Sequence, residues 1–189
     1  MSRPATLDHD AALDLALELF WQRGYRDVSV DDLVRETGLN RHTLYGRYRN
    51  KYGLALVLLE RYCSEGTRRL EEVLHGLGSP RQRLQQLLDL RDPDCTDPFW
   101  RRMLERGCFA MRMVTEMRET HPEVVGLVSQ RTSALLDEVT AIVREGQERG
   151  EFRRDLGADV LATTIVSGWI AALIVPEAQR RSVGLAALN

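Results

Sequence analysis

The sequence contains almost no lysine, few cysteines and no apolar run long enough to cross a membrane. Of the 26 basic residues, 25 are arginine, and Lys51 is the single lysine. The three cysteines, Cys63, Cys95 and Cys108, are odd in number and widely spaced, which argues against a disulfide framework or a cysteine-based zinc site. The most apolar stretch, Val160–Val175, has 16 residues, whereas a membrane span needs about 20. This stretch is expected to be a buried helix.

Composition and charge exclude further classes of protein. Apolar residues make up 43% and charged residues 29% of the 189 residues, which is ordinary for a folded domain and argues against disorder. The net charge of −2 excludes a generally basic, histone-like DNA binder but leaves local basic patches open. Residues 1–10 are polar and lack the apolar segment of a signal peptide, so we expect a cytoplasmic protein with no membrane partner.

Strand patterns are almost absent, and the chain is expected to be all-α. Apolar residues recur at helical spacing nearly throughout, and single glycine or proline residues mark the turns. The expected helices are two short ones that begin after Ser29 and Asn40, and longer ones over residues 7–23, 51–75, 81–90, 99–120 (bent at Gly107), 122–149 and 157–175. We expect two functional parts, residues 1–52 and residues 53–189.

The two short helices carry matching start signals. Ser29 and Asn40 are N-cap residues, and Asp32 stands three positions after Ser29, where a capping box places its acidic member. Gly38 lies between the two helices. Two short helices joined by a glycine-containing turn form a helix-turn-helix when a preceding helix packs across both. The apolar stripe expected to pack in this way consists of Leu15, Leu19 and Phe20.

The second short helix has a face without negative charge. No acidic residue occurs between residues 37 and 59, although four basic residues fall within eleven positions of this segment. On a helical wheel, Leu44 and Tyr48 point to the core. His42, Thr43 and Gly46 point the opposite way. Such a face suits the major groove of DNA, where arginine or histidine donates to guanine and a threonine methyl contacts thymine; the alternative is a solvated basic surface with no partner.

The residues predicted to contact DNA surround this face. Tyr45 and Lys51 are expected to bind phosphate, Lys51 at a helix N-terminus, and Ser29 is expected to hold the opposite wall of the groove. The full predicted set is Ser29, Asn40, Arg41, His42, Thr43, Tyr45, Gly46, Arg47 and Lys51.

Residues 16–54 resemble the DNA-binding domain of the tetracycline-repressor (TetR) family of bacterial transcription regulators. The residues that carry the resemblance are Leu19, Phe20, Gly24, Tyr25, Ser29, Leu33, Val34, Gly38, Leu39, Thr43, Leu44, Tyr45, Tyr48 and Lys51. The single lysine of the chain falls where the family has its phosphate-contacting lysine. The chain departs from the family pattern at His42, at Gly46 and at Tyr52–Gly53, and these departures bear on the operator sequence rather than on the fold.

The resemblance implies that the rest of the chain is a helical domain that binds a small effector and dimerises through its last long helices. Residues 106–110 and 121–124 are similar to a recurrent stretch of such domains. Two long apolar helices also fit a four-helix dimer bundle; the alternative is burial inside a monomer. The predicted dimer interface consists of Val128, Leu135, Val139, Ile142, Leu161, Ile165, Gly168, Trp169 and Ala172.

An effector pocket is predicted from methionine and aromatic side chains at helical spacing. Such side chains make adaptable, mostly apolar pockets, so an apolar or aromatic effector is expected; the alternative is ordinary core. The predicted pocket residues are Phe99, Trp100, Met103, Phe109, Met113 and Met117.

No catalytic, cofactor or metal site is predicted. Glu72 and His75 have the spacing of one di-iron ligand pair, but that site needs a second pair and two more glutamates. Cys108 fits a small buried residue better than a redox sensor. The favoured interpretation is a homodimeric repressor that binds a palindromic operator and is released by an effector. The alternative is an α-helical small-molecule carrier or enzyme with an incidental basic helix.

Overall fold

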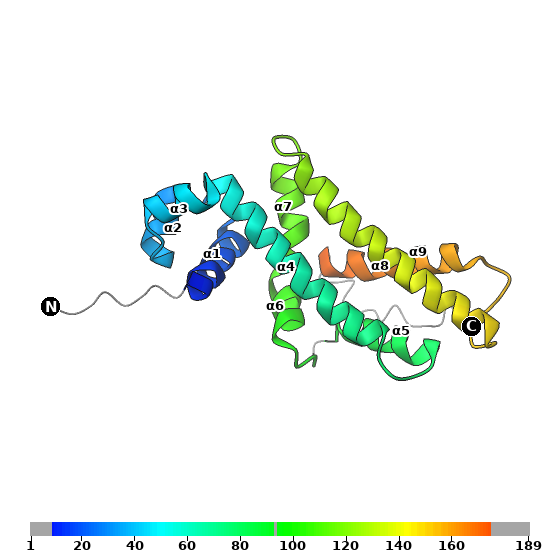
Figure 1. Ribbon diagram of the computed structural model, residues 1–189. Coiled ribbons are helices and arrows are strands. Elements are labelled where there is room, and N and C mark those ends of the chain that lie inside the picture. Colours follow the sequence, from blue (N-terminus) through cyan, green and yellow to red (C-terminus); the bar gives the residue numbers. More distant parts are fainter. Residues whose placement is uncertain (1–8, 93, 175–189) are drawn as a thin grey trace. The chain divides into compact units, whose positions relative to one another are not determined.

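The computed structural model describes residues 9–92 and 94–174 of the chain. Within these residues it contains nine α-helices and no strand, so the all-α prediction is confirmed. The helices, drawn in chain order in Figure 1, are α1 (His9–Arg23), α2 (Val30–Thr37), α3 (Arg41–Tyr48), α4 (Lys51–Leu74), α5 (Pro80–Asp89), α6 (Pro98–Arg106), α7 (Phe109–Met117), α8 (Glu123–Glu148) and α9 (Ala158–Ile174). Residues 7 and 8 of the first expected helix and residue 175 of the last lie outside the described residues.

The chain packs as two compact units. Of the described residues, the first unit contains residues 9–63 and 109–127, and the second contains residues 64–92, 94–108 and 128–174. Helices α4 and α8 each begin in the first unit and end in the second. The division by packing therefore gives the first half of α4 and all of α7 to the unit of the helix-turn-helix. The functional boundary after residue 52 was inferred from motifs and stays a prediction.

In the first unit, α1 supplies much of the core, through a face that includes the predicted Leu19 and Phe20 but not Leu15. Leu19, Phe20 and Trp21 are buried, whereas Leu15 is 51% exposed. The prediction that Leu15 packs with Leu19 and Phe20 is therefore wrong. At 100° per residue, the buried arc runs from Leu19 through Phe20 to Trp21, and Leu15 lies just outside the Leu19 edge.

An aromatic cluster joins three helices of the first unit. Trp21 of α1 lies 5.2 Å from Tyr62 of α4 and 5.9 Å from Phe109 of α7, between ring centroids, and Tyr62 lies 5.4 Å from Phe109. Edge-on and tilted arrangements at these distances are the favourable ones for aromatic pairs. The cluster therefore packs α7, which is remote in sequence, against the helix that precedes the helix-turn-helix.

In the second unit, α5, α6 and α9 meet around two tryptophans. Trp169 of α9 donates its indole N–H to the carbonyl of Leu87 in α5 at 3.1 Å. The Trp169 ring also packs edge-on against Trp100 of α6, with 5.5 Å between centroids. Because the indole N–H is satisfied, this large side chain can be buried without a lost hydrogen bond.

One predicted helix is two helices in the structure. The sequence predicted a single bent helix over residues 99–120, but α6 ends at Arg106 and α7 begins at Phe109. Gly107 has a φ of 79°, which side-chain-bearing residues rarely adopt, and its N–H donates to the carbonyl of Met103. The glycine therefore caps α6 instead of continuing it. Of the helices in the described ranges, none is both long and apolar enough to cross a membrane.

Candidate nucleic-acid interface

Helix α2 begins with the capping box that the sequence predicted. The Ser29 hydroxyl accepts from the backbone N–H of Asp32 at 3.0 Å, and the Asp32 carboxylate accepts from the backbone N–H of Ser29 at 2.9 Å. These reciprocal bonds satisfy two backbone donors that the helix start would leave open. The predicted N-cap and box are confirmed, and they set the first residue of α2.

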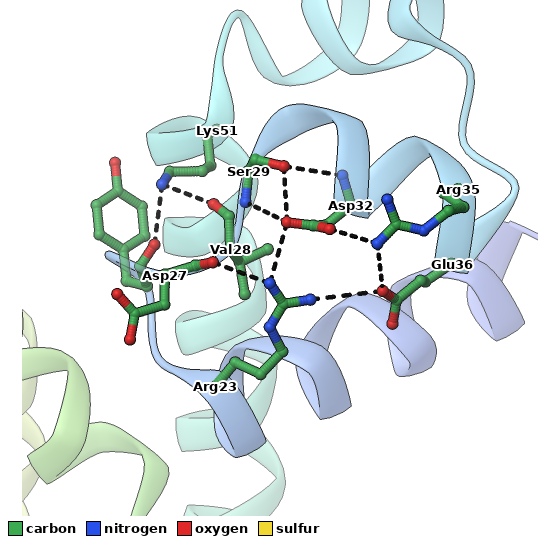
Figure 2. Close-up of polar contacts among 9 residues, drawn as sticks. Arg23, Asp27, Val28, Ser29, Asp32, Arg35, Glu36 and Lys51 are labelled. Carbon is green, nitrogen blue, oxygen red and sulfur yellow. Dashed lines mark hydrogen bonds and ion pairs between the residues drawn. The ribbon is translucent and has the colours of Figure 1, made fainter.

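The Asp32 carboxylate is also the centre of a polar network that ties α1 to α2 (Figure 2). It accepts hydrogen bonds from Ser29, from Arg35 and from Arg23 of α1, the last at 3.1 Å. Arg23 in turn donates to the carbonyl of Asp27 at 3.0 Å. The hydrogen bonds from Ser29, followed by the bond from Arg35, hold the pKa of Asp32 far below its usual value. The sequence indicated the cap but not Arg23, whose partner lies nine residues away.

Acid is expected to destabilise the first unit through Asp32. A carboxylate with a folded-state pKa below its unfolded value stabilises the fold above that unfolded value, here near 3.8, and this stability is lost as the pH falls. We expect Asp32→Asn to lower the melting temperature at neutral pH and to flatten its decline between about pH 5 and pH 2. Thermal unfolding followed by circular dichroism measures both effects, and an unchanged acid decline in the variant would assign it to other carboxylates.

The turn between α2 and α3 has its polar groups satisfied inside the protein. Gly38, with φ 73°, caps α2 in the left-handed conformation. The buried Thr37 hydroxyl donates to the carbonyl of Leu33 and accepts from the N–H of Leu39 at 3.1 Å. At the start of α3, the Asn40 side-chain oxygen accepts from the backbone N–H of Thr43 at 2.7 Å, which confirms the second predicted N-cap. These bonds set the position of α3 relative to α2.

Helix α3 is held from beneath by two side chains. Leu44 is fully buried, and Tyr48 is buried with its hydroxyl 2.6 Å from Nε2 of His9 in α1. The opposite side of the helix is open. Its exposed residues are Arg41, His42, Tyr45, Gly46 and Arg47, with Thr43 half-buried. The described face of α3 thus has no acidic side chain of its own.

On this face Tyr45 and Gly46 are open to solvent, whereas Arg41 has a protein partner. Tyr45 is 49% exposed, and a Cβ built at Gly46 would meet no atom within 4 Å. Arg41 is engaged in an ion pair with Asp31 of α2. Both partners of this pair are mostly exposed, and exposed ion pairs contribute little to stability. Arg41 can therefore exchange Asp31 for a phosphate or a base edge at small cost.

Lys51 has internal partners that the sequence did not indicate (Figure 2). Its ammonium donates to the carbonyl of Tyr25 at 2.9 Å and to the carbonyl of Val28 at 2.8 Å, and it lies 4.3 Å from the centre of the Tyr25 ring. Burial lowers the pKa of this ammonium. Lys51 therefore ties the segment before α2 to the start of α4. Its predicted contact with phosphate stays a prediction, since an ammonium has a third N–H to donate.

The junction of α3 and α4 is a close contact between backbones. Arg49 adopts a φ of 67°, and the Asn50 side chain accepts from the N–H of Gly53 at 2.8 Å. A Cβ built at Gly53 would lie 1.9 Å from the carbonyl oxygen of Tyr48. Only glycine fits this approach. In the sequence, Gly53 is only a departure from a pattern, because its contact with Tyr48 becomes visible only when α3 and α4 are placed together.

The first unit also links the helix-turn-helix to the start of α8. The Tyr52 ring stacks on His121 with 3.7 Å between centroids, and the Tyr52 hydroxyl donates to the carboxylate of Glu123. Burial and this carboxylate raise the pKa of Tyr52. Arg26 donates to the carbonyl of Glu116 at 2.9 and 3.1 Å. These four side chains were not predicted to have a role, because the contacts between them and their partners span 69 to 90 residues of sequence.

The structure does not bring the six predicted pocket residues together within one unit. Phe109, Met113 and Met117 belong to the first unit, and Phe99, Trp100 and Met103 belong to the second. All except the half-buried Phe99 are buried. Phe109 is part of the aromatic core described above, which is the alternative that the sequence left open for it. The pocket itself stays a prediction.

The predicted dimer residues are placed mostly on the inner side of their helices. Val139, Ile142, Leu161, Ile165, Trp169 and Ala172 are buried within the single chain, while Val128, Leu135 and Gly168 are half-buried. A partner chain cannot reach side chains that this chain already covers. An interface on α8 and α9 must therefore use their other, exposed faces, and the spacing of apolar residues alone could not distinguish the two sides.

The described residues contain no cluster of side chains that could bind a metal ion. In residues 9–92 and 94–174, no group of three or more histidine, cysteine or carboxylate side chains could hold a metal ion. Cys63, Cys95 and Cys108 are half-buried. His75 faces Glu138 at 3.5 Å rather than a second ligand pair.

Family comparisons match both parts of the chain. Residues 12–58 match the model described as bacterial regulatory proteins, tetR family, and residues 80–184 match the tetracyclin repressor-like C-terminal domain. The HTH-type transcriptional repressor ComR of Escherichia coli (strain K12) is 30% identical over 149 residues, which are 79% of this chain and 70% of ComR.

Solved structures have the same fold. A transcriptional regulator of the TetR family from Cytophaga hutchinsonii superposes with a TM-score of 0.75 at 16% identity, over 96% of this chain and 90% of that one. A cysteine mutant of the TetR family transcriptional regulator CifR was solved in complex with 26 bp double-strand operator DNA. It has a TM-score of 0.72 at 25% identity, over 95% of this chain and 91% of that one.

Proposed function

Because the chain belongs to the tetR family of bacterial regulatory proteins, we propose that it is a transcriptional repressor. It binds a palindromic operator as a homodimer and leaves the operator when a small effector binds. The observation that carries this proposal is the face of α3, which is exposed and free of acidic side chains while Leu44 and Tyr48 anchor the helix from beneath. The operator complex of CifR, a structure of the same fold, supports the choice of duplex DNA.

The α3 face can read DNA in the major groove, which is wide enough for a helix. His42 and Thr43 stand where base edges would lie, and the absence of a side chain at Gly46 lets the helix approach closely. Arg41, Tyr45 and Arg47 flank this centre and are suited to phosphates on either side. Ser29, at the capped start of α2, is the proposed contact with the opposite wall of the groove, and its N–H and hydroxyl would have to exchange the Asp32 carboxylate for a phosphate.

An exposed uncharged stripe on α9 supports the homodimer. Its members recur at helical spacing and are Val160, Thr163, Thr164, Ser167 and Ala171, all exposed in the single chain. Val160, the largest apolar side chain of the stripe, is 50% exposed. A helix face of small, uncharged residues lets another helix approach closely, as in a four-helix interface. Two-fold symmetry then places two copies of α3 on half-sites about 34–36 Å apart.

The response to an effector is a shift between two states of the dimer. A ligand in the helical part beyond α4 releases the operator if it binds the non-binding state more tightly, with a coupling of about 1–3 kcal/mol. Catalysis is not part of this proposal, since recognition and release require no chemical step. The site of action is the cytoplasm, where bacterial DNA is found.

Selection of bound duplexes from a random library tests the proposal. We expect a palindrome to be recovered, with two half-sites one helical turn apart. The logarithm of the affinity for this palindrome should fall steeply with the logarithm of salt concentration, since released counterions accompany phosphate contacts. Shallow salt dependence and no preferred sequence would instead favour a carrier or enzyme with an incidental basic helix.

Single substitutions on α3 should separate positioning from sequence recognition. Arg47→Ala is expected to weaken binding to all sequences and to reduce the salt slope by about one. His42→Ala is expected to change the preferred base at one position of each half-site, by about 1–3 kcal/mol. Fluorescence anisotropy with single-base operator variants measures both. Lys51 is a poor probe of phosphate contact, because its loss would also free the carbonyls of Tyr25 and Val28.

A further inference from the structure

Arg91 continues the buried face of α5 in the second unit. That face consists of Pro80, Leu84 and Leu87, all buried. The turn continues past the end of α5, because the N–H of Arg91 donates to the carbonyl of Leu88 at 3.2 Å. Arg91 therefore follows Leu87 by four residues, on the same side, and its side chain is carried inward: the residue is 7% exposed.

The Arg91 guanidinium has no protein partner in the described residues. Its Nε and Nη1 atoms are buried and make no hydrogen bond within residues 9–92 and 94–174. Two other arginines with a buried unbonded nitrogen differ in this respect. Arg69 pairs with Asp97 at 3.1 Å, and Arg83 pairs with Glu145. Arg91 is thus buried without the compensation that these two arginines have.

Such an arrangement is unfavourable unless an anion completes it. Burial lowers the pKa of the Arg91 guanidinium, but arginine stays protonated in proteins because its ordinary pKa is so high. A buried charge without a partner destabilises a fold, and native proteins keep one only where a partner or a function requires it. The planar guanidinium matches a carboxylate through two parallel hydrogen bonds.

We infer that Arg91 anchors the effector site, and that the effector is a small organic monocarboxylate with an apolar body. One guanidinium compensates one negative charge, so a dianionic phosphate would leave a charge unpaired. The apolar body is favoured by the surroundings of Leu87, one turn before Arg91. The carbonyl of Leu87 accepts the indole N–H of Trp169, and the Trp169 ring packs on Trp100. This inference rests on the proposed function, and it adds a charged anchor to the apolar effector predicted from the sequence.

The test uses the full-length protein and two matched sets of probes. Benzoate, phenylacetate and hexanoate are compared with benzamide, phenylacetamide and hexanamide by thermal shift and by isothermal titration calorimetry. We expect at least one carboxylate to raise the melting temperature and its amide to leave it unchanged. Arg91→Met and Arg91→Lys should weaken that carboxylate at least about tenfold, because neither presents the fork of donors. Equal effects of acids and amides, or no effect of any carboxylate, would overturn the inference.

The stability of the ligand-free Arg91→Met protein gives a second, independent outcome. If Arg91 has its partner only when a ligand is bound, replacing it by an apolar side chain of similar length removes an unpaired buried charge from the ligand-free protein. The melting temperature should then rise by about 2–4 °C. Arg101→Met, which removes an exposed arginine of α6 in the same unit, should change it by less than about 1 °C. A lower melting temperature for Arg91→Met would mean that Arg91 serves the fold, and would overturn the inference.

Failure of this inference can be distinguished from failure of the proposed function. Operator binding by the ligand-free wild type tests the regulator without any carboxylate. If the protein binds the operator but none of the carboxylates, only the effector assignment is contradicted. If the protein binds carboxylates through Arg91 but selects no DNA sequence, the proposed repressor function is contradicted and the ligand site is supported.

Discussion

Replacing Gly53 by alanine is expected to abolish operator binding, although the substitution adds only one methyl group. The added Cβ would lie 1.9 Å from the carbonyl oxygen of Tyr48, so α3 and α4 would have to move apart. The clash involves backbone and not a flexible side chain, and overpacking of this kind costs about 3 kcal/mol. Because Tyr48 ends α3, the displacement moves the proposed reading face directly. Anisotropy titration with the selected operator measures the loss.

Gly46→Ala is the matched control for folding stability and not for DNA binding, because it adds the same methyl group to a glycine that lies on the proposed reading face of α3. A Cβ at Gly46 meets no atom within 4 Å, and alanine in an exposed helix interior is more stable than glycine by about 1 kcal/mol. This variant should therefore melt at a higher temperature than the wild type. Operator binding retained by Gly53→Ala would show that the α3–α4 junction can yield without moving the reading face.

Ser167→Arg is expected to convert the dimer to a monomer and to lower operator affinity about 100-fold or more, because each half-site then binds alone. Ser167 lies in the middle of the exposed uncharged stripe of α9. In a two-fold interface the two introduced arginines would face each other or the same uncharged surface, and a desolvated, unpaired charge is strongly unfavourable. Sedimentation velocity measures the oligomeric state, and anisotropy measures the affinity.

Gln85→Arg serves as the control for added charge. Gln85 is exposed on α5 in the same unit, and an arginine there could pair with Asp89, which Gln85 already contacts at 2.7 Å. This variant should remain dimeric with unchanged affinity. A dimeric Ser167→Arg protein would place the interface elsewhere on the chain, and it would leave the α3 face and its predicted substitutions unaffected.

Features that depend on near neighbours could be predicted from the sequence. The described helices correspond to those expected from apolar spacing, except that the one expected over residues 99–120 is split into α6 and α7, and the caps at Ser29 and Asn40 form as predicted. A cap involves a side chain and a backbone N–H three residues away, so both partners are visible in one short segment. The outward side of α3 follows in the same way, because Leu44 and Tyr48 are four residues apart and share one face.

What the sequence by itself determined is therefore the all-α fold, the helix-turn-helix and the side of α3 that faces outward. Only the tertiary structure decided which charges have partners: Lys51 reaches carbonyls 23 and 26 residues away, and Arg91 is buried with none in the described part of the chain. The tertiary structure also decided which side of α9 is buried within the chain and which is left exposed. The physical reason is that helical periodicity identifies a face, whereas pairing and burial depend on elements that meet only after folding.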